Sequence, residues 1–304
     1  MESVYLCLDV GGTEIKAAPV NEYGVLLASV RHFPARAKEA ADCLMEHFCG
    51  IINEIRGSVS APAGVRLAFP GPFDYEQGIC LLQGLDKYDA LYGVNLKRNL
   101  SERLKLPAES IRFANDAAAF ALGEMGFGPG RNAGRSLFIC IGTGCGSTFG
   151  TYGVPAPRGT YGVPDSGYLY DAPFLDGCID DYLSRRGLMK LSKELTGTAL
   201  DGRMLAQEAA GGSREALLCF RIFGERIRDA LAPFLNAFRP EVLCFGGQIM
   251  RSSRFFLSPV EEYCAERGIL LYLTEDTSIR TLQGLTRIRL CLDKAEGLCY
   301  DIPQ

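Results

Sequence analysis

Residues 6–18 combine the residue types that bind a nucleotide phosphate. They read LCLDVGGTEIKAA, so an apolar run ends at Asp9, two glycines and Thr13 follow, and an alternating run begins at once. The pattern predicts a buried strand, a tight turn and an antiparallel second strand. Gly11 and Gly12 leave backbone N–H groups accessible to an anion, Thr13 adds a hydroxyl and Lys16 a cation. Asp9 suits Mg²⁺ bound through water. A Gly-Gly pair between strands is alternatively only a hairpin turn.

Two further glycine turns follow apolar strands later in the chain. A predicted strand over 136–141 leads into Gly142, Thr143 and Gly144, which repeats the opening layout about 130 residues further on. A strand over 241–245 leads into Gly246 and Gly247. The repeat predicts a duplicated fold with two halves that face each other. Two turns can then hold a polyphosphate from opposite sides, and the third can admit a flat purine.

A carboxylate and an amide follow another predicted strand, over 110–114. Asp116 directly after a strand is placed to act as general base toward a substrate hydroxyl. Its neighbour Asn115 can form hydrogen bonds with a polyol. Alternatively, the pair only caps the alanine-rich helix predicted over 117–125.

The elements that must position these residues alternate between strands and helices. Before residue 114 the pattern predicts strands at 4–10, 15–20, 25–31 and 64–69, and an amphipathic helix across roughly 38–56. The tripeptide at 70–72, Pro-Gly-Pro, ends the fourth strand. A short helix is predicted near 96–105, with Asn95 as its N-cap. The fold class is therefore α/β.

Bulk properties exclude several classes of function. The 304 residues suffice for two domains, and 47% hydrophobic with 22% charged residues is an ordinary globular composition. No apolar run reaches the roughly 18 residues of a membrane span. Because the strand pattern starts by Val4 without a basic region or a cleavage site, we expect no secretory signal. A net charge of −4 without a basic tract argues against nucleic acid as partner. The 12 cysteines include no C-x-x-C pair, so we expect buried free thiols in a reducing cytoplasm.

In these motifs the chain resembles the ROK family, whose members are sugar kinases and sugar-responsive repressors. The matching segments, in order along nearly the whole chain, are 9–13 with Lys16, 70–72, 115–117, 123–124, 142–146 and 246–247. The resemblance implies a duplicated actin-like, ribonuclease-H-like ATPase fold with two domains around a cleft. It implies an N-terminal domain of 1–114 plus about 287–304, with a returning helix around 292–300, and a larger domain of 115–286. It also implies a homodimer or homotetramer.

The resemblance assigns roles to residues that match the family's motifs. Asp116 is similar to the catalytic base, and Asp9 to the residue that assists Mg²⁺. Other residues match the family's contacts to the phosphates of ATP, its turn beside the adenosine, and its contacts to the sugar. The phosphate contacts are Gly11, Gly12, Thr13, Lys16, Gly142, Thr143 and Gly144; the adenosine-side turn is Gly246 and Gly247; the sugar contacts are Gly71, Asn115, Asp116, Asp165 and Tyr168.

The chain departs from the family on the sugar side. Where family members carry Glu-x-Gly-His, this chain has Asp165-Ser166-Gly167-Tyr168, which alters both polar groups. The family's zinc site needs that histidine and three clustered cysteines, whereas Cys178 is the only cysteine between 146 and 218, so we expect no structural zinc. The charged loop with Asp86, Lys87, Tyr88 and Asp89 is either a solvated surface or part of a pocket for a different or charged sugar.

The leading hypothesis is an ATP- and Mg²⁺-dependent sugar kinase, which transfers the γ-phosphate to a hydroxyl of a hexose or hexose derivative. A non-catalytic sugar- or nucleotide-binding relic is the alternative, because the zinc motif and the Glu/His pair are changed. A transcriptional regulator of the family is a further alternative, but such proteins place a helix-turn-helix before the kinase-like body. Here the first strand begins near residue 4, which leaves no room for that module in this sequence.

Overall fold

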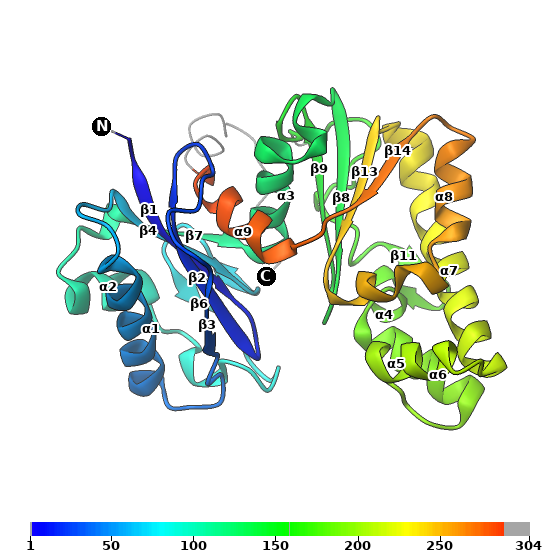
Figure 1. Cartoon of the computed structure of the whole chain (residues 1–304), viewed down its shortest axis with the longest axis horizontal. Coiled ribbons are helices and arrows are strands. Elements are labelled where there is room, and N and C mark those ends of the chain that lie inside the picture. The colour runs from blue at the N-terminus through cyan, green and yellow to red at the C-terminus, as the bar shows by residue number, and fades with distance from the viewer. Residues whose placement is uncertain (1, 158, 289–304) are drawn as a thin grey trace. The chain divides into compact units, whose positions relative to one another are not determined.

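The computed structural model describes residues 2–157 and 159–288, and it divides into two compact units. The first contains residues up to Pro129 together with the described residues from Ser278 onward, and the second contains Gly130–Thr277. Each unit has its own five-stranded sheet (Figure 1). The division falls after residue 129 and before 278, whereas the family resemblance suggested 114 and about 287. The predicted returning helix at 292–300 lies outside the described residues.

The sheet of the first unit has the order β3-β2-β1-β4-β7. The strands β1 to β3 pair in antiparallel fashion, and β4 and β7 continue the sheet parallel to β1. Their bounds are β1 Val4–Val10, β2 Glu14–Asn21, β3 Arg31–Pro34, β4 Gly64–Phe69 and β7 Ile111–Asn115. A small hairpin, β5 Phe73–Asp74 with β6 Ile79–Cys80, follows β4.

Helices cover both faces of this sheet because successive side chains of a strand point to opposite faces. Leu6 and Leu8 of β1 pack in one apolar cluster with the buried face of α1, while Cys7 belongs to a second cluster with residues of α3 and α9. Asn95 caps α2 through a bond from the Arg98 N–H, as predicted. The helices are α1 Ala41–Arg56, α2 Leu96–Leu104, α3 Asp116–Phe127 and α9 Thr277–Leu285, with short 3-10 turns at Asp89–Leu91, Ala108–Ser110 and Pro129–Asn132.

The sheet of the second unit repeats the topology of the first. Its order is β10-β9-β8-β13-β14, with the first three strands antiparallel and the last two parallel to β8. The bounds are β8 Arg135–Ile141, β9 Cys145–Thr151, β10 Val154–Pro155, β13 Val242–Gly246 and β14 Leu270–Leu273. Thus β1 corresponds to β8 and β2 to β9, and the predicted duplication is confirmed.

The remaining elements of the second unit pack around one apolar core. This core joins the buried face of β8 to the long helix α7 and its neighbours. Ser213 caps α7, which runs without interruption through 25 residues. The elements are β11 Pro173–Phe174, β12 Gly177–Cys178, α4 Ile179–Tyr182, α5 Arg185–Thr196, α6 Gly202–Ala210, α7 Arg214–Phe238, a 3-10 helix Gln248–Phe255 and α8 Ser258–Ala265.

The strand predicted over 25–31 is wrong for most of its length. The Asn21 side chain accepts hydrogen bonds from the N–H groups of Tyr23 (3.1 Å) and Val25 (2.8 Å), and Gly24 has a φ of 76°. This turn leaves only an isolated bridge between Val20 and Leu26 before the chain bends, so β3 begins at Arg31. Local side-chain bonding by asparagine outweighs the alternating pattern here.

The helices α3 and α9 approach each other closely at two glycines. A Cβ on Gly123 would lie 1.9 Å from the carbonyl oxygen of Arg280, and one on Gly284 would lie 1.8 Å from that of Ala119. The buried Glu124 carboxylate accepts a bond of 3.1 Å from the Arg280 guanidinium. This contact fixes α3, the helix that Asp116 begins.

No helix within residues 2–157 and 159–288 combines the length and the apolar character that crossing a bilayer requires. The ten cysteines of this part of the chain are all free thiols.

Candidate active site

The first sheet brings three predicted site segments to one edge. Because β1, β4 and β7 run parallel, their carboxyl ends meet there, and the pairing aligns Asp9 with Ala68 and Phe69 with Asn115. Asp9, the loop with Gly71, and the pair at 115–116 therefore follow three adjacent strands. Strands lie about 4.8 Å apart, so the ends of β1 and β7 are about 10 Å apart, a span suited to a phosphoryl group beside its acceptor.

The turn between β1 and β2 presents backbone donors to solvent. Gly11 closes the turn by donating to the Glu14 carbonyl oxygen at 3.0 Å, and a Cβ on Gly11 would lie only 2.8 Å from that oxygen. Gly12 and Thr13 are exposed, and within the described chain their N–H groups form no hydrogen bond. Two adjacent exposed donors without protein acceptors are suited to bind phosphate oxygens.

Lys16 is partly engaged within the protein. It pairs across the hairpin with Asp9, and its ammonium group donates to the Ser278 hydroxyl at 2.7 Å and lies 3.9 Å from the Glu14 carboxylate. If Lys16 binds phosphate as predicted, its ammonium group would do so while it also interacts with Ser278 and Glu14.

The Asn115 side chain is oriented by bonds at both of its ends. Its oxygen accepts from the N–H groups of Ala117 (3.0 Å) and Ala118 (3.2 Å), and its nitrogen donates to the Tyr75 hydroxyl at 3.2 Å. Tyr75 in turn donates to the carbonyl oxygen of Phe69 at 3.0 Å. Asn115 is thus the N-cap of α3, and its amide also lies within hydrogen-bonding reach of the neighbouring Asp116 carboxyl, whose pKa it lowers. Sequence reasoning missed Tyr75, since no local pattern distinguishes it.

Asp116 is the first residue of α3, and its side chain is exposed to solvent. One carboxylate oxygen accepts from the Ala117 N–H at 2.9 Å. Desolvation by the surrounding protein raises the pKa of the Asp116 carboxyl above its usual value, while the Ala117 N–H and the positive charge of Lys87 act in the opposite direction. An accessible carboxylate with a raised pKa is suited to accept a proton from a hydroxyl.

In the second unit the other two glycine turns lie at one edge of the sheet. Gly246 pairs with Cys140 in parallel register, so β8 and β13 end side by side. Gly247 has a φ of 98°, and a Cβ there would lie 2.2 Å from the carbonyl oxygen of Ile141. Its N–H donates to the Thr277 hydroxyl at 2.9 Å. Only glycine permits this close approach of the two turns.

The turn at 142–144 has the same free donors as the first one. Thr143 is exposed, and the N–H groups of Thr143 and Gly144 form no hydrogen bond in the part of the chain that the structure describes. Gly142 has nothing within 4 Å of the position of a Cβ, whereas a Cβ on Gly144 would lie 2.8 Å from an oxygen of Asp180.

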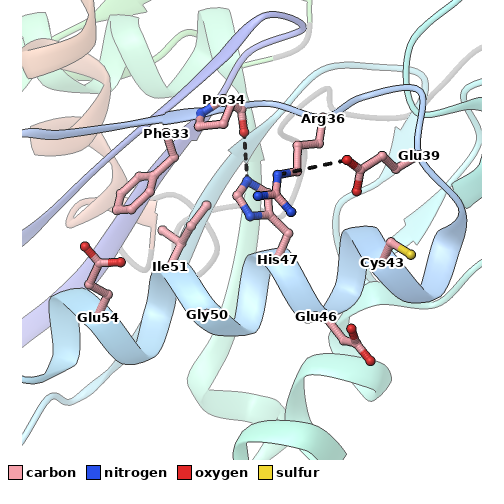
Figure 2. A pocket seen from close by; sticks show the side chains of 10 residues that line it. All are labelled: Phe33, Pro34, Arg36, Glu39, Cys43, Glu46, His47, Gly50, Ile51 and Glu54. Atoms are coloured by element: carbon pink, nitrogen blue, oxygen red, sulfur yellow. Dashed lines mark hydrogen bonds and ion pairs between the residues drawn. The ribbon is translucent and has the colours of Figure 1, made fainter.

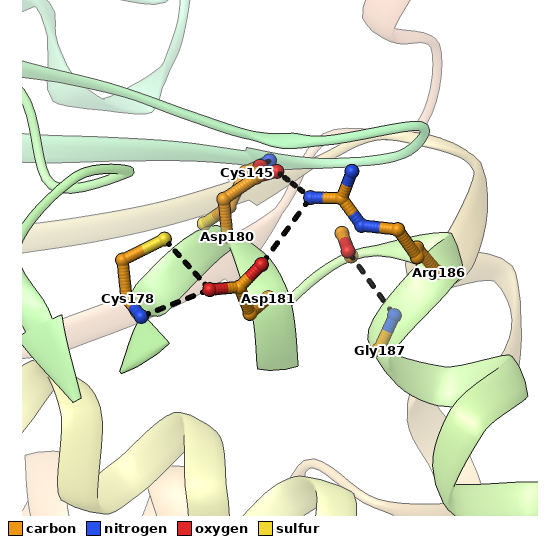
Figure 3. A network of polar contacts seen from close by, with 7 residues as sticks. Cys145, Cys178, Asp180, Asp181, Arg186 and Gly187 are labelled. Atoms are coloured by element: carbon orange, nitrogen blue, oxygen red, sulfur yellow. Dashed lines mark hydrogen bonds and ion pairs between the residues drawn. The ribbon is translucent and has the colours of Figure 1, made fainter. Parts of the chain in front are cut away.

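An acidic residue and an arginine support this second turn (Figure 3). Asp180 accepts from the Cys145 N–H at 2.6 Å and from Arg186 at 2.9 Å, and Arg186 also lies 3.6 Å from Asp181. The N–H of Arg185 donates to the Gly142 carbonyl oxygen at 2.8 Å. Asp180 and Arg186 were missed from the sequence because they belong to a helical segment about 40 residues after the turn.

The predicted sugar contacts Asp165 and Tyr168 lie in a loop of the second unit. Asp165 is exposed, and the Tyr168 ring lies 6.0 Å from that of Tyr170. The loop is anchored to β9, since the Leu169 N–H donates to the buried Ser147 hydroxyl at 2.8 Å. Gly71, Asn115 and Asp116, the other predicted sugar contacts, belong to the first unit.

The carboxylate of Asp9 fits an Mg²⁺ ion carried with ATP. Mg²⁺ prefers one or two carboxylates together with water and phosphate oxygens, and Asp9 stands at the sheet edge beside the exposed turn. Within the described residues no three His, Cys, Asp or Glu side chains gather as a metal site. Cys178 instead lies with its sulfur 3.1 Å from Asp181. The absence of zinc stays a prediction.

A hollow of about 530 Å³ lies elsewhere on the first unit, between β3 and α1 (Figure 2). Charged side chains of Arg36, Glu39 and Glu54 line it, and the His47 ring bonds to the Pro34 carbonyl oxygen at 2.7 Å. It includes none of the predicted site residues.

Known proteins resemble the chain over most of its length. Residues 5–276 match the model of the ROK family. A glucokinase of Thermotoga maritima is 25% identical over 276 residues, with 84% of this chain and 85% of that protein covered. An N-acetyl-D-glucosamine kinase of Pectobacterium atrosepticum is 27% identical over 265 residues, with coverages of 80% and 83%.

A solved structure confirms the predicted fold class. The ROK family glucokinase of Streptomyces griseus, in complex with glucose and AMPPNP, superimposes with a TM-score of 0.71 at 20% identity, over 95% of this chain and 99% of that one. The two matching sheets are therefore those of a duplicated actin-like ATPase fold. With the family model matched from residue 5 to residue 276, the chain belongs to the ROK family.

Proposed function

We propose that this protein is an ATP-dependent sugar kinase that transfers the γ-phosphate to a hydroxyl of a hexose or hexose derivative. The observation that carries the proposal is the position of Asp116: an exposed carboxylate with a raised pKa at the same sheet edge as the free donors of Gly12 and Thr13. A base and an anion site on neighbouring strand ends are the two parts that phosphoryl transfer to an alcohol needs.

Each part has a defined chemical task. Asp116 accepts the proton of the attacking hydroxyl, and its bond from the Ala117 N–H holds the carboxylate in place. The N–H groups of Gly12 and Thr13 bind phosphate oxygens, as we propose also for Thr143 and Gly144. Gly246 and Gly247 would form the adenosine-side turn. Mg²⁺, held by Asp9 through water, would offset phosphate charge.

The groups beside the base are suited to a sugar as acceptor. The Asn115 amide, which Tyr75 holds beside Asp116, can donate to a polyol hydroxyl next to the one that reacts. Relatives named glucokinase and N-acetyl-D-glucosamine kinase support a hexose or its N-acetyl derivative. Asp165 and Tyr168 are the proposed additional sugar contacts. Because the family has Glu and His at these positions, the preferred hexose can differ from that of other family members.

The test is ADP release from MgATP against a panel of acceptors. Glucose, mannose, N-acetylglucosamine, N-acetylmannosamine, glucosamine and glucuronate sample neutral, acetylated, cationic and anionic hexoses. We expect one acceptor to raise ADP release well above the rate without sugar, with a sugar phosphate as the second product. Tight ATP binding without turnover on any acceptor would instead support the non-catalytic relic.

A further inference from the structure

The loop that follows the β5–β6 hairpin is fastened to the first glycine turn. The buried Tyr88 donates through its hydroxyl to the Gly11 carbonyl oxygen at 2.8 Å, and its N–H donates to the Ala37 carbonyl oxygen at 2.7 Å. The Tyr88 ring also packs against that of Phe69, with 5.2 Å between centroids. The residue before it in the chain, Lys87, is therefore held at the turn.

Lys87 lies beside the glycine turn, and its charge reaches the proposed base. A Cβ on Gly12 would lie 3.4 Å from Cδ of Lys87, so the lysine stem passes over the exposed α-carbon of Gly12. Its ammonium charge also acts on the Asp116 carboxylate and lowers the pKa of that group. The side chain thus lies next to residue 12 of the phosphate turn, and its charge acts on residue 116.

The ammonium group of Lys87 is not committed to another side chain. Among residues 2–157 and 159–288 it forms no hydrogen bond or ion pair with an acidic group within 4 Å, and its side chain is partly exposed. Lys16, by contrast, bonds to Ser278, and Lys38 forms an ion pair with Asp86. Lys87 can therefore offer its charge to a ligand without losing a partner.

We propose that Lys87 is a further catalytic residue. Its ammonium group binds an oxygen of the γ-phosphoryl group while this group passes from ATP, bound at the Gly11–Thr13 turn, to the sugar hydroxyl beside Asp116. The inference rests on the proposed kinase function. In the transfer, the sugar oxygen bonds to the γ-phosphorus and the bond from phosphorus to the ADP oxygen breaks, with its electron pair leaving on ADP. The hydroxyl proton passes to Asp116, and Lys87 stays protonated and supplies only charge.

Lys87 also affects the pKa of the proposed base, Asp116. Desolvation raises the pKa of Asp116, whereas the Ala117 N–H, the charge of Lys87, its own N–H and the Asn115 side chain lower it. Removal of this cation should raise the pKa of Asp116 further, since a nearby positive charge stabilises the carboxylate. The acid limb of kcat/KM against pH should then move to higher pH, which a purely structural role would not produce.

The first experiment compares binding of ATP and ADP, because only ATP carries the phosphoryl group that Lys87 would contact. Calorimetric titration with Mg²⁺ is made on the wild type and on Lys87→Met, Lys87→Gln and Lys87→Arg. We expect the preference for ATP over ADP to fall about tenfold in the Met and Gln variants, the scale of one lost charge-assisted bond. Lys87→Arg should keep most of it. Lys38→Met, which removes a lysine that forms an ion pair with Asp86 of the same loop, is the matched control.

Turnover measured on the same variants completes the test. With the preferred sugar we expect kcat to fall about a hundredfold in Lys87→Met, as for one lost group that stabilises the transition state. An unchanged ATP/ADP preference in Lys87→Met and Lys87→Gln would overturn the inference. So would a change confined to KM for an anionic sugar, which would assign Lys87 to the acceptor. If the wild type phosphorylates no sugar, the kinase proposal fails, and the ATP/ADP comparison still tests Lys87.

Discussion

The side-chain nitrogen of Asn115 donates to the Tyr75 hydroxyl at 3.2 Å, and that hydroxyl donates to the carbonyl oxygen of Phe69 at 3.0 Å. Tyr75 therefore joins the end of β4 to the end of β7 and fixes the amide beside Asp116. A Cβ on Gly71 would lie 3.2 Å from the same hydroxyl, which places the loop after β4 in this arrangement.

Tyr75→Phe should remove the hydrogen bond that orients the Asn115 amide, without removing a group that contacts the sugar. We expect KM for the sugar to rise about fivefold, the scale of one neutral hydrogen bond, with KM for ATP unchanged. Steady-state kinetics with each substrate varied in turn would show this. Tyr23→Phe, at a tyrosine that is 69% exposed, is the control. An equal rise in both KM values would indicate a general structural effect of Tyr75 instead.

Substitution of Gly142 in the second unit should affect ATP binding but not the stability of the fold. Gly142→Ala meets no atom within 4 Å, so it should leave the melting temperature unchanged. It should weaken ATP binding about fivefold or more, if phosphate approaches the backbone there. Calorimetric titration would measure the affinity. Unchanged ATP binding would remove Gly142 from the phosphate site.

Gly247→Ala should instead destabilise the fold. The φ of 98° and the Ile141 oxygen 2.2 Å from a new Cβ impose strain of about 1–3 kcal/mol. Thermal melts of Gly247→Ala beside Gly50→Ala, a helical glycine with nothing within 4 Å, would show the difference. A Gly247→Ala protein as stable as the wild type would contradict the close approach of the two turns.

The buried pair of Glu124 and Arg280 should stabilise the contact of α3 with α9. Glu124 is 1% exposed and Arg280 26% exposed. Glu124→Gln therefore leaves the largely buried Arg280 guanidinium without a negatively charged partner at this position. We expect a loss of about 2–3 kcal/mol in the free energy of unfolding, measured with urea. Glu225→Gln, in the surface pair with Arg221, should cost at most about 0.5 kcal/mol. Equal losses in both variants would show that burial adds nothing.

Asp116→Asn should raise stability at neutral pH. A carboxyl whose pKa is higher in the folded than in the unfolded state favours the protonated form in the fold. Its ionisation therefore costs stability as pH rises through these two pKa values, and below both of them it has no effect. Melting temperatures from pH 3 to 8 should show Asp116→Asn above the wild type near pH 7 and equal to it at the acid end. A variant less stable than the wild type at pH 7 would contradict this sign.

The sequence predicted the parts of the site that local pattern encodes. The first strand, its Gly-Gly turn and Thr13 are consecutive in the sequence, and Asn115 and Asp116 directly follow their strand. Short-range patterns were therefore enough to predict these parts of the site. Tyr75 meets Asn115 across 40 residues, and Tyr88 meets Gly11 across 77, so no local pattern could place Lys87 at the turn. The strand predicted at 25–31 failed because the Asn21 side chain forms a turn of its own.

The role of Asp116 is the central claim, and the turnover of Asp116→Asn tests it most directly. The variant keeps the size of the side chain and an oxygen to accept from the Ala117 N–H, but it cannot take up the hydroxyl proton. With the preferred sugar and saturating MgATP, we expect kcat at least about a hundredfold below the wild type, with the Kd for ATP within about threefold. Turnover close to that of the wild type in purified, folded Asp116→Asn would contradict the account.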